Sequence, residues 1–200
     1  MKPTNETPIL DHEKHEYTIG GVVKPGVTDI LQTVKPVKYR HNEVLMARGS
    51  YFHELCHAEA MGKLDHAAIE AEEDEIFRAE QMGIAAAYSL FLQEFGLGME
   101  QPLCEQSLWH KGLDYCGTPD QIFFKNKVLV DLKFGQKQKS HGLQLCAYHL
   151  LLINNYNIIS NEWKNVAVYP GTDGNYRADT VKITDKLVNV WYSFINVWRW

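Results

Sequence analysis

The hydrophobic pattern of the chain changes after Pro102, and this change limits the possible folds more than any other feature of the sequence. Before Pro102 the apolar residues recur at steps of three and four, which is typical of amphipathic helices. After it, short runs rich in Val, Ile, Phe, Leu and Tyr alternate with turn sequences such as Lys111-Gly112, which is typical of strands. The sequence therefore predicts an α/β fold in which helices flank a central mixed sheet.

Helices are expected wherever apolar residues share one face at a period of 3.6 residues. Their ranges are 28–34, 43–61, 74–95 and 140–155, with a last helix that begins at Thr184 or Asp185. Thr28 is expected to cap the first helix and Pro36 to end it, because proline cannot continue a helix. Gly49 is a candidate break in the second helix, since glycine weakens a helix interior.

Strands are expected at 103–110, 113–124, 128–134, 163–169 and 177–183, each bounded by turn residues. The first three are expected to pair antiparallel, and Asp173-Gly174 predicts a hairpin between the last two. Residues 1–26, which are rich in proline and contain a Gly-Gly pair, are expected to form an irregular arm that includes a short hairpin. Residues 27–200 then form a single domain, because a chain of 200 residues with 45% hydrophobic content can bury one core.

The charge balance is acidic, with a formal net charge of -5 at pH 7. Proteins that coat nucleic acid through bulk electrostatics are usually strongly basic, so this class is disfavoured. An enzyme that binds DNA in a cleft needs only local positive charge. A basic stretch offers such charge through Lys125, Lys127, Lys133, Lys137, Lys139 and His141.

Several other classes of protein are disfavoured by the composition. The four cysteines form no Cys-x-x-Cys pair, so neither a zinc ribbon nor an iron–sulfur cluster is expected. The most apolar stretch, 143–159, is interrupted by glutamine, histidine and asparagine, which a lipid-exposed span would not tolerate, so no membrane segment is expected. The N-terminal residues do not resemble a targeting segment, which makes the cytoplasm the expected compartment.

Two acidic residues on neighbouring expected strands are the first candidates for chemistry. The turn 125–127 joins these strands and lets Asp120 and Asp131 approach each other, and paired carboxylates attract a hard divalent cation. Lys133 lies two residues after Asp131, so period-two alternation puts both side chains on one face. Carboxylates that hold Mg²⁺ or Mn²⁺ beside a lysine are suited to hydrolysis of a phosphodiester.

Four short motifs follow one another along the chain in helices and strands. They are Arg48-Gly49-Ser50-Tyr51-Phe52-His53, Gly117-Thr118-Pro119-Asp120, Asp131-Leu132-Lys133-Phe134-Gly135 and Gln144-Leu145-Cys146-Ala147-Tyr148. In order and spacing they resemble the Gly-x-x-x-His, Gly-x-x-Asp, Asp-x-Lys and Gln-x-x-x-Tyr motifs of the RecB-like branch of the PD-(D/E)XK nuclease family. Residues 26–31, Glu105 and residues 168–174 add a resemblance to its single-domain exonucleases, which include the mitochondrial genome maintenance exonuclease and phage relatives.

This resemblance implies a restriction-endonuclease-like fold and a Mg²⁺- or Mn²⁺-dependent deoxyribonuclease. The implied enzyme is an exonuclease that acts on single-stranded or end-containing DNA in replication, recombination or repair, in the cytoplasm of a bacterial or phage-infected cell. It leaves any protein partner unidentified. The implied metal ligands are His53, Asp120, Asp131 and the carbonyl of Leu132, and Lys133 is the implied catalytic lysine.

Further site residues are implied with less defined roles. Gln144 and Tyr148 lie one helical turn apart and would face the site. For Glu105 three interpretations stay open: a ligand of a second metal, a residue that positions a ligand, and a solvated side chain. Candidate contacts to DNA phosphates are Arg48, Lys137 and Lys139.

Two alternatives remain for the same sequence. His53-Glu54-Leu55-Cys56-His57 also spells His-Glu-x-x-His, which on a helix places two histidines on one face for zinc, with Glu54 as the general base of a metallopeptidase. The second alternative is a catalytically silent DNA-binding module of the nuclease fold. The intact carboxylates and lysine favour an active enzyme over such a module.

Overall fold

A mixed five-stranded sheet forms the centre of the computed structural model, which describes residues 2–34 and 43–200. In spatial order its strands are β10 (Tyr176–Val181), β9 (Lys164–Pro170), β8 (Val128–Leu132), β7 (Gln121–Phe123) and β4 (Leu103–Cys104). β8 and β9 run parallel, whereas the other neighbouring strands run antiparallel. The expected α/β fold with a central mixed sheet is therefore confirmed.

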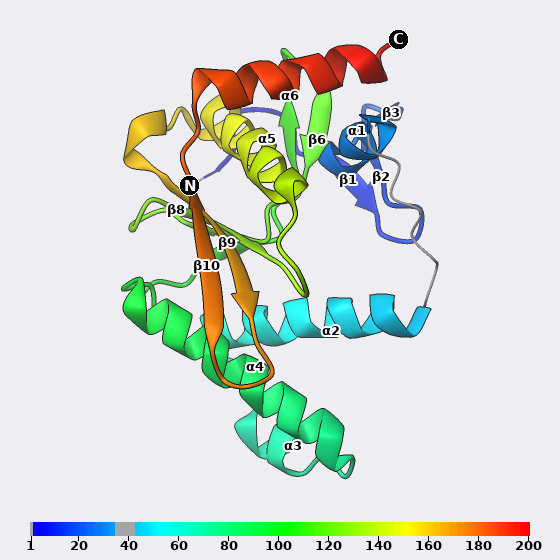
Figure 1. The fold of residues 1–200 in the computed structure, drawn as a ribbon. Helices are drawn as coiled ribbons and strands as arrows, with labels where there is room; N and C mark the ends of the chain where they lie inside the picture. Colours follow the sequence, from blue (N-terminus) through cyan, green and yellow to red (C-terminus); the bar gives the residue numbers. More distant parts are fainter. Residues whose placement is uncertain (1, 35–42) are drawn as a thin grey trace.

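Helices cover both faces of this sheet (Figure 1). One face carries α2 (Glu43–Ala60) and α4 (Glu75–Glu94), with the short α3 (His66–Glu70) packed against α4. The other face carries α5 (Lys139–Tyr156), and α6 (Asp185–Trp198) packs across α5. The sheet is thus the middle layer between two helical layers.

The strand β8 separates two hydrophobic cores. Val130 and Leu132 pack with residues of α2 and α4, while Leu129 packs with residues of α5. Because side chains alternate along a strand, Asp131 lies on the same face as Leu129, beneath α5. All residues of β8 are buried, as expected for a strand that helices cover on both faces.

The parallel pairing of β8 and β9 depends on the long connection between them. Parallel neighbours cannot be joined by a tight turn, and here α5 and the 3₁₀ helix η1 (Ser160–Glu162) make the crossover. β9 and β10 are joined by the expected hairpin, in which Gly174 has a positive φ of 81°. The expected ends of β9, β10 and α5 agree with the structure to within two residues.

Two expected strands are each divided into two in the structure. The range 103–110 contains β4 and β5 (Leu108–His110), and the range 113–124 contains β6 (Tyr115–Gly117) and β7. β5 and β6 form a separate two-stranded sheet, so the expectation of two continuous strands is wrong. Glu105 has a positive φ of 48° and Pro119 offers no N–H to a strand ladder, which ends the pairing at these points.

The N-terminal segment is more regular than its sequence suggests. It forms a three-stranded antiparallel sheet of β1 (Ile9–Asp11), β2 (Glu16–Ile19) and β3 (Val22–Lys24), so the expected short hairpin is present but the rest of the segment is not irregular as expected. Gly20 and Gly21 both adopt a positive φ and make the tight turn between β2 and β3. The hydroxyls of Tyr17 and Thr118 lie 2.9 Å apart and connect this sheet to the chain before β7.

The helix boundaries depend on caps that the sequence only partly indicates. α1 (Val27–Val34) begins one residue before Thr28, so the expected cap at Thr28 is wrong; the Asp29 carboxylate instead accepts the N–H of Gly26 at 2.8 Å. α2 continues through Gly49 without the candidate break. Pro36 lies outside the described residues. Within the described part of the chain, no helix is both long and apolar enough to cross a membrane.

Candidate active site

Asp120 and Asp131 meet at one end of the pair β7 and β8. Asp120 directly precedes β7 and is not in the middle of a strand as expected, while Asp131 is the fourth residue of β8. The two strands pair antiparallel with Gln121 opposite Val130, which brings the two acidic residues to neighbouring positions. The Asp120 Oδ2 atom accepts the backbone N–H of Leu132 at 2.6 Å, so the first carboxylate is fixed to the strand that carries the second.

The carboxyl group of Asp131 is fully buried and has no hydrogen bond. Neither of its oxygen atoms accepts one in the described part of the chain, and its exposed fraction is 0%. Its closest charged partner is the Lys133 ammonium, whose Nζ forms an ion pair with Oδ1 at 2.8 Å without meeting the geometry of a regular hydrogen bond, and the charges of Asp120 and His53 also lie near it. Burial raises the pKa of Asp131 to about 6, against the opposing effect of Lys133. Buried carboxylates are normally hydrogen-bonded, so this group is ready to accept a ligand.

Lys133 provides the positive charge of the site. It follows the last residue of β8, and its backbone N–H donates to the Val168 carbonyl at 2.8 Å, which continues the parallel pairing with β9. Burial alone would lower the pKa of Lys133, but the nearby carboxylates of Asp131 and Asp120 together outweigh it and raise the pKa. The ammonium therefore stays charged at neutral pH and is suited to stabilise negative charge instead of removing protons.

His53 reaches the acidic pair from α2, on the other side of the site from α5. Its Nδ1 atom lies 3.6 Å from Oδ1 of Asp120. Burial opposes the charged form of both groups, yet their mutual attraction raises the pKa of His53 and lowers the pKa of Asp120. The structure therefore brings together the side chains of His53, Asp120, Asp131 and Lys133, as expected.

Gln144 and Tyr148 lie one turn apart on α5. The Gln144 Nε2 atom donates to the Tyr148 hydroxyl at 2.9 Å. Tyr148 is buried, and after burial the charges of Asp131 and Asp120 are the largest causes that raise the pKa of its hydroxyl. A Cβ atom at Gly117 would lie 2.9 Å from the Tyr148 ring, so glycine at this position lets α5 approach β6. Tyr148 therefore faces the site that the four residues form.

Glu105 lies at the edge of the site in an unusual conformation. Its positive φ turns the chain so that its N–H donates to the main-chain carbonyl of Asp120 at 3.0 Å. Its carboxylate is half exposed, and Oε1 lies 3.6 Å from Nδ1 of His57. The two histidines of α2 thus approach different carboxylates, His53 that of Asp120 and His57 that of Glu105.

The three candidate DNA contacts differ in their surroundings. Arg48 pairs with Glu80 of α4 and lies 5.6 Å from the centre of the Phe52 ring. Lys137 pairs with Asp179 of β10 at 2.7 Å. Lys139 is exposed in the first turn of α5. Two of the three candidate cations are therefore engaged in ion pairs, and the third is exposed.

Sequence reasoning missed the pair His141 and Tyr169. The Tyr169 hydroxyl in β9 lies 2.8 Å from Nδ1 of His141 in α5. Burial, followed by the charge of Lys133, lowers the pKa of His141 to about 4, so it is neutral and wrongly counted in the basic stretch. The only sequence signal for Tyr169 is its place in the resemblance at 168–174, and alternation in β9 gives its face but not its partner.

The donor set of the site fits a hard divalent cation. In residues 2–34 and 43–200, no three side chains of His, Cys, Asp or Glu already form a group that could hold a metal ion. The carboxylates are drawn to other partners: Asp120 to the Leu132 N–H and Asp131 to Lys133. Two carboxylates, one of them without a hydrogen bond, beside an imidazole are nevertheless the oxygen-rich ligands that Mg²⁺ and Mn²⁺ prefer.

Comparison with known proteins adds no relative to this description. No protein-family model matches the chain, and a search of curated proteins gives no significant match.

Proposed function

We propose that this chain is a Mg²⁺- or Mn²⁺-dependent deoxyribonuclease with a restriction-endonuclease-like fold. The observation that carries the proposal is the buried carboxyl group of Asp131, which accepts no hydrogen bond although Asp120 and Lys133 lie beside it. A fold keeps such a costly group most readily when a ligand uses it. The mixed sheet with helices on both faces is compatible with the proposed fold.

Each residue of the site has a task in phosphodiester hydrolysis. His53, Asp120, Asp131 and the Leu132 carbonyl would hold the cation, which when bound polarises the phosphate and acidifies water. A water molecule attacks phosphorus through its oxygen and gives up one proton to solvent, the bond to one bridging oxygen breaks, and that oxygen leaves with a proton taken from solvent. Lys133 keeps its own proton and stabilises the negative charge that develops on the phosphoryl oxygens. The hydrogen bond from Gln144 to the Tyr148 hydroxyl fixes these two side chains on the α5 side of the site, where they limit how a bound substrate can be oriented.

The resemblance of the four motifs extends the proposal to an exonuclease acting on single-stranded or end-containing DNA in replication, recombination or repair. The acidic net charge is compatible with such an enzyme, because the substrate would enter a local site and not coat the surface.

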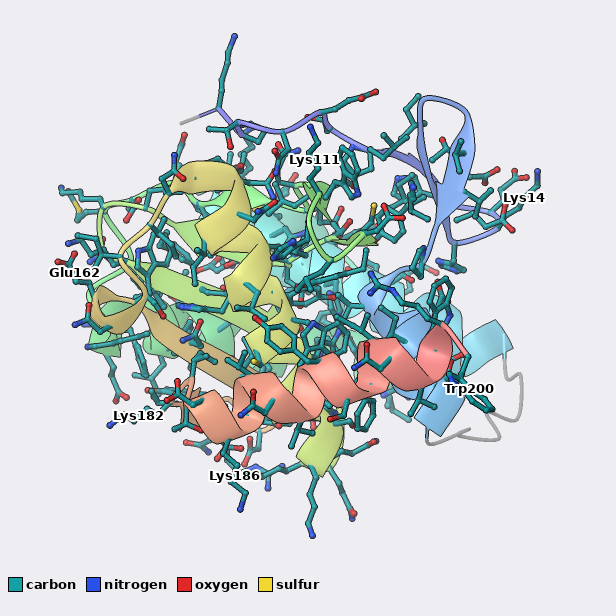
Figure 2. The ribbon with its side chains drawn as sticks, turned by 90° about the horizontal axis from the view of Figure 1, so that it is seen from above. Lys14, Lys111, Glu162, Lys182, Lys186 and Trp200 are labelled. Atoms are coloured by element: carbon teal, nitrogen blue, oxygen red, sulfur yellow. The ribbon has the colours of Figure 1, made fainter. Side chains whose placement is uncertain are left out.

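The first experiment measures hydrolysis of linear and closed circular DNA by the wild type with Mg²⁺, with Mn²⁺ and with a chelator. Asp120→Asn and Lys133→Ala are expected to reduce the rate by more than about 100-fold. Matched controls lie on α6: Asp185→Asn, and Lys186→Ala, whose side chain points away from the fold (Figure 2). Both controls are expected to keep the wild-type rate.

Other outcomes of this experiment would favour the alternatives. Cutting of closed circles would identify an endonuclease, and DNA binding without any cutting would identify a silent module. Peptide hydrolysis under zinc that is lost in Glu54→Gln would identify a metallopeptidase. Since Glu54 is exposed on α2 and the two histidines approach different carboxylates, we expect no such activity.

A further inference from the structure

A cavity of about 670 Å³ opens beside the proposed active site. It lies between α2, the segment after β8 and the β9–β10 hairpin, whose tip rests near α4 (Figure 1). Its volume falls within the range of about 300 to 1,000 Å³ that is usual for sites of small ligands. The side chains that matter here are Arg48, Phe52, Phe134, Tyr169, Tyr176 and Arg177.

Phe134 connects this cavity to the proposed active site. It directly follows Lys133, and its ring centre lies 5.5 Å from that of His53 and 5.1 Å from that of Phe52. Tyr169 lines the cavity as well, and it directly follows Val168, whose carbonyl accepts the backbone N–H of Lys133 at 2.8 Å. A ligand in the cavity would therefore lie close to a phosphate bound at the proposed active site.

Two arginines line the cavity, and they differ in their partners. Arg48 pairs with Glu80. Arg177 instead lies 5.5 Å from the centre of the Tyr169 ring and donates to the Gly135 carbonyl at 3.4 Å. A guanidinium held by a ring and a carbonyl keeps its charge and further donors for an anion.

The hairpin that forms one wall of the cavity is fixed in place. A Cβ atom at Gly83 of α4 would lie 1.9 Å from the Thr172 carbonyl oxygen, so glycine allows the two backbones to touch. The carboxylate of Asp173, which also lines the cavity, accepts the N–H of Asn175 at 3.1 Å within the turn. The acidic residue is thus engaged locally, and the wall is built before any ligand arrives.

We propose that this cavity binds one nucleotide of a single-stranded DNA end, next to the phosphate that is cut. This inference rests on the proposed function. The half-buried rings of Phe134 and Tyr176 offer surface to an unstacked base, and Arg177 binds its phosphate. Bases in a duplex are covered by their stacked neighbours, so the cavity selects an unpaired end.

The test measures binding of a short fluorescein-labelled oligo-thymidylate by anisotropy in chelator, where no hydrolysis occurs. Arg177→Ala is expected to bind about tenfold more weakly than the wild type, since it removes a phosphate contact and a cation held on a ring. The matched control is Arg199→Ala, because Arg199 donates to the Leu113 carbonyl at the far end of α6. Its affinity is expected to stay within about twofold of the wild type.

A second substrate separates this inference from the proposed function. Hydrolysis of bis(4-nitrophenyl) phosphate with Mn²⁺ needs the metal site but no base, so it reports on the proposed function independently of base binding in the cavity. The control Arg199→Ala is expected to keep the wild-type rate on this ester. If the wild type does not hydrolyse this ester or DNA, the proposed function fails. If it hydrolyses both while Arg177→Ala binds the oligonucleotide normally, or if a blunt duplex binds as tightly as the single strand, only the nucleotide cavity is overturned.

Discussion

Two buried polar residues on opposite sides of the contact between the sheet and α5 differ in how their polar atoms are satisfied. Both Asp131 and His149 have an exposed fraction of 0%. His149 has a partner for each ring nitrogen, with Asn165 Oδ1 2.8 Å from Nδ1 and Ser160 Oγ 2.7 Å from Nε2. Asp131 has no hydrogen bond to either oxygen. The polar atoms of His149 are therefore satisfied within the core, whereas those of Asp131 are not.

The difference indicates which buried polar group serves the fold and which serves a ligand. A neutral imidazole with the proton on Nδ1 donates to Asn165 and accepts the hydroxyl proton of Ser160, so nothing further is needed. A buried carboxyl of this kind costs stability, because it has lost water and its close neighbours are one ammonium, which attracts it, and the Asp120 carboxylate, which repels it. We therefore expect metal to act on Asp131 and not on His149.

The largest expected effect concerns metal binding at Asp131. In the wild type, Mn²⁺ at about 100 times its Kd should stabilise the fold by about 2.7 kcal/mol, because it binds only the folded state. Asp131→Asn should lose this stabilisation and lower the DNA hydrolysis rate by more than about 100-fold. Thermal unfolding with and without Mn²⁺ measures the first effect. The control Asp185→Asn should keep the stabilisation by Mn²⁺. If Asp131→Asn kept it as well, the contrast between Asp131 and His149 would be contradicted.

A smaller effect, on stability alone, is expected at His149. His149→Ala leaves Asn165 and Ser160 without these partners and opens a cavity between α5 and the sheet. Together these changes should lower the free energy of unfolding by about 2 to 4 kcal/mol. Urea unfolding measures this loss, and the exposed His12→Ala should stay within about 0.5 kcal/mol of the wild type. The Mn²⁺-induced stabilisation should survive in His149→Ala. Its loss there would mean that the two groups are one functional unit.

Local patterns were enough to predict the helices and part of the site. The period of 3.6 residues located α4 and α5, whereas the N-cap of α4, Asp74, was not predicted. The spacing of Asp131 and Lys133 placed both on one face, where Nζ lies 2.8 Å from Oδ1. These features depend on neighbours within one or two turns of chain, which sequence spacing reports directly.

Features that depend on distant contacts could not be predicted in this way. The division of 113–124 between two sheets follows from the pairing of β6 with β5 and of β7 with β4 and β8, and all these segments are rich in strand-forming residues. The neutral state of His141 depends on burial and on Lys133, which the basic sequence around it conceals. The missing hydrogen bonds of Asp131 likewise follow from packing beneath α5.

The smallest expected effect is a difference in pH dependence, measured in chelator. Burial, partly offset by the bond to Asn165, lowers the pKa of His149 below its ordinary value of 6.5, so the unfolded chain binds a proton there more readily than the folded one. Its stabilisation is therefore complete above about pH 6.5 and is lost as the pH falls, by at most about 1.4 kcal/mol per pH unit. His149→Gln should remove this part of the slope in urea unfolding between about pH 7 and pH 5, whereas His12→Gln should keep it.

Asp131 should make the opposite contribution in the same titration. Its pKa is raised to about 6 in the folded state from an ordinary 3.8, so its stabilisation is present below pH 3.8 and is lost as the pH rises through about 6. Asp131→Asn should therefore make the fall in stability toward acid pH steeper, while His149→Gln makes it shallower. Both residues are buried at the contact between the sheet and α5. If the free energy of unfolding changed with pH by the same slope in Asp131→Asn and His149→Gln, burial alone, and not the presence of hydrogen-bond partners, would set the pKa values of these two groups.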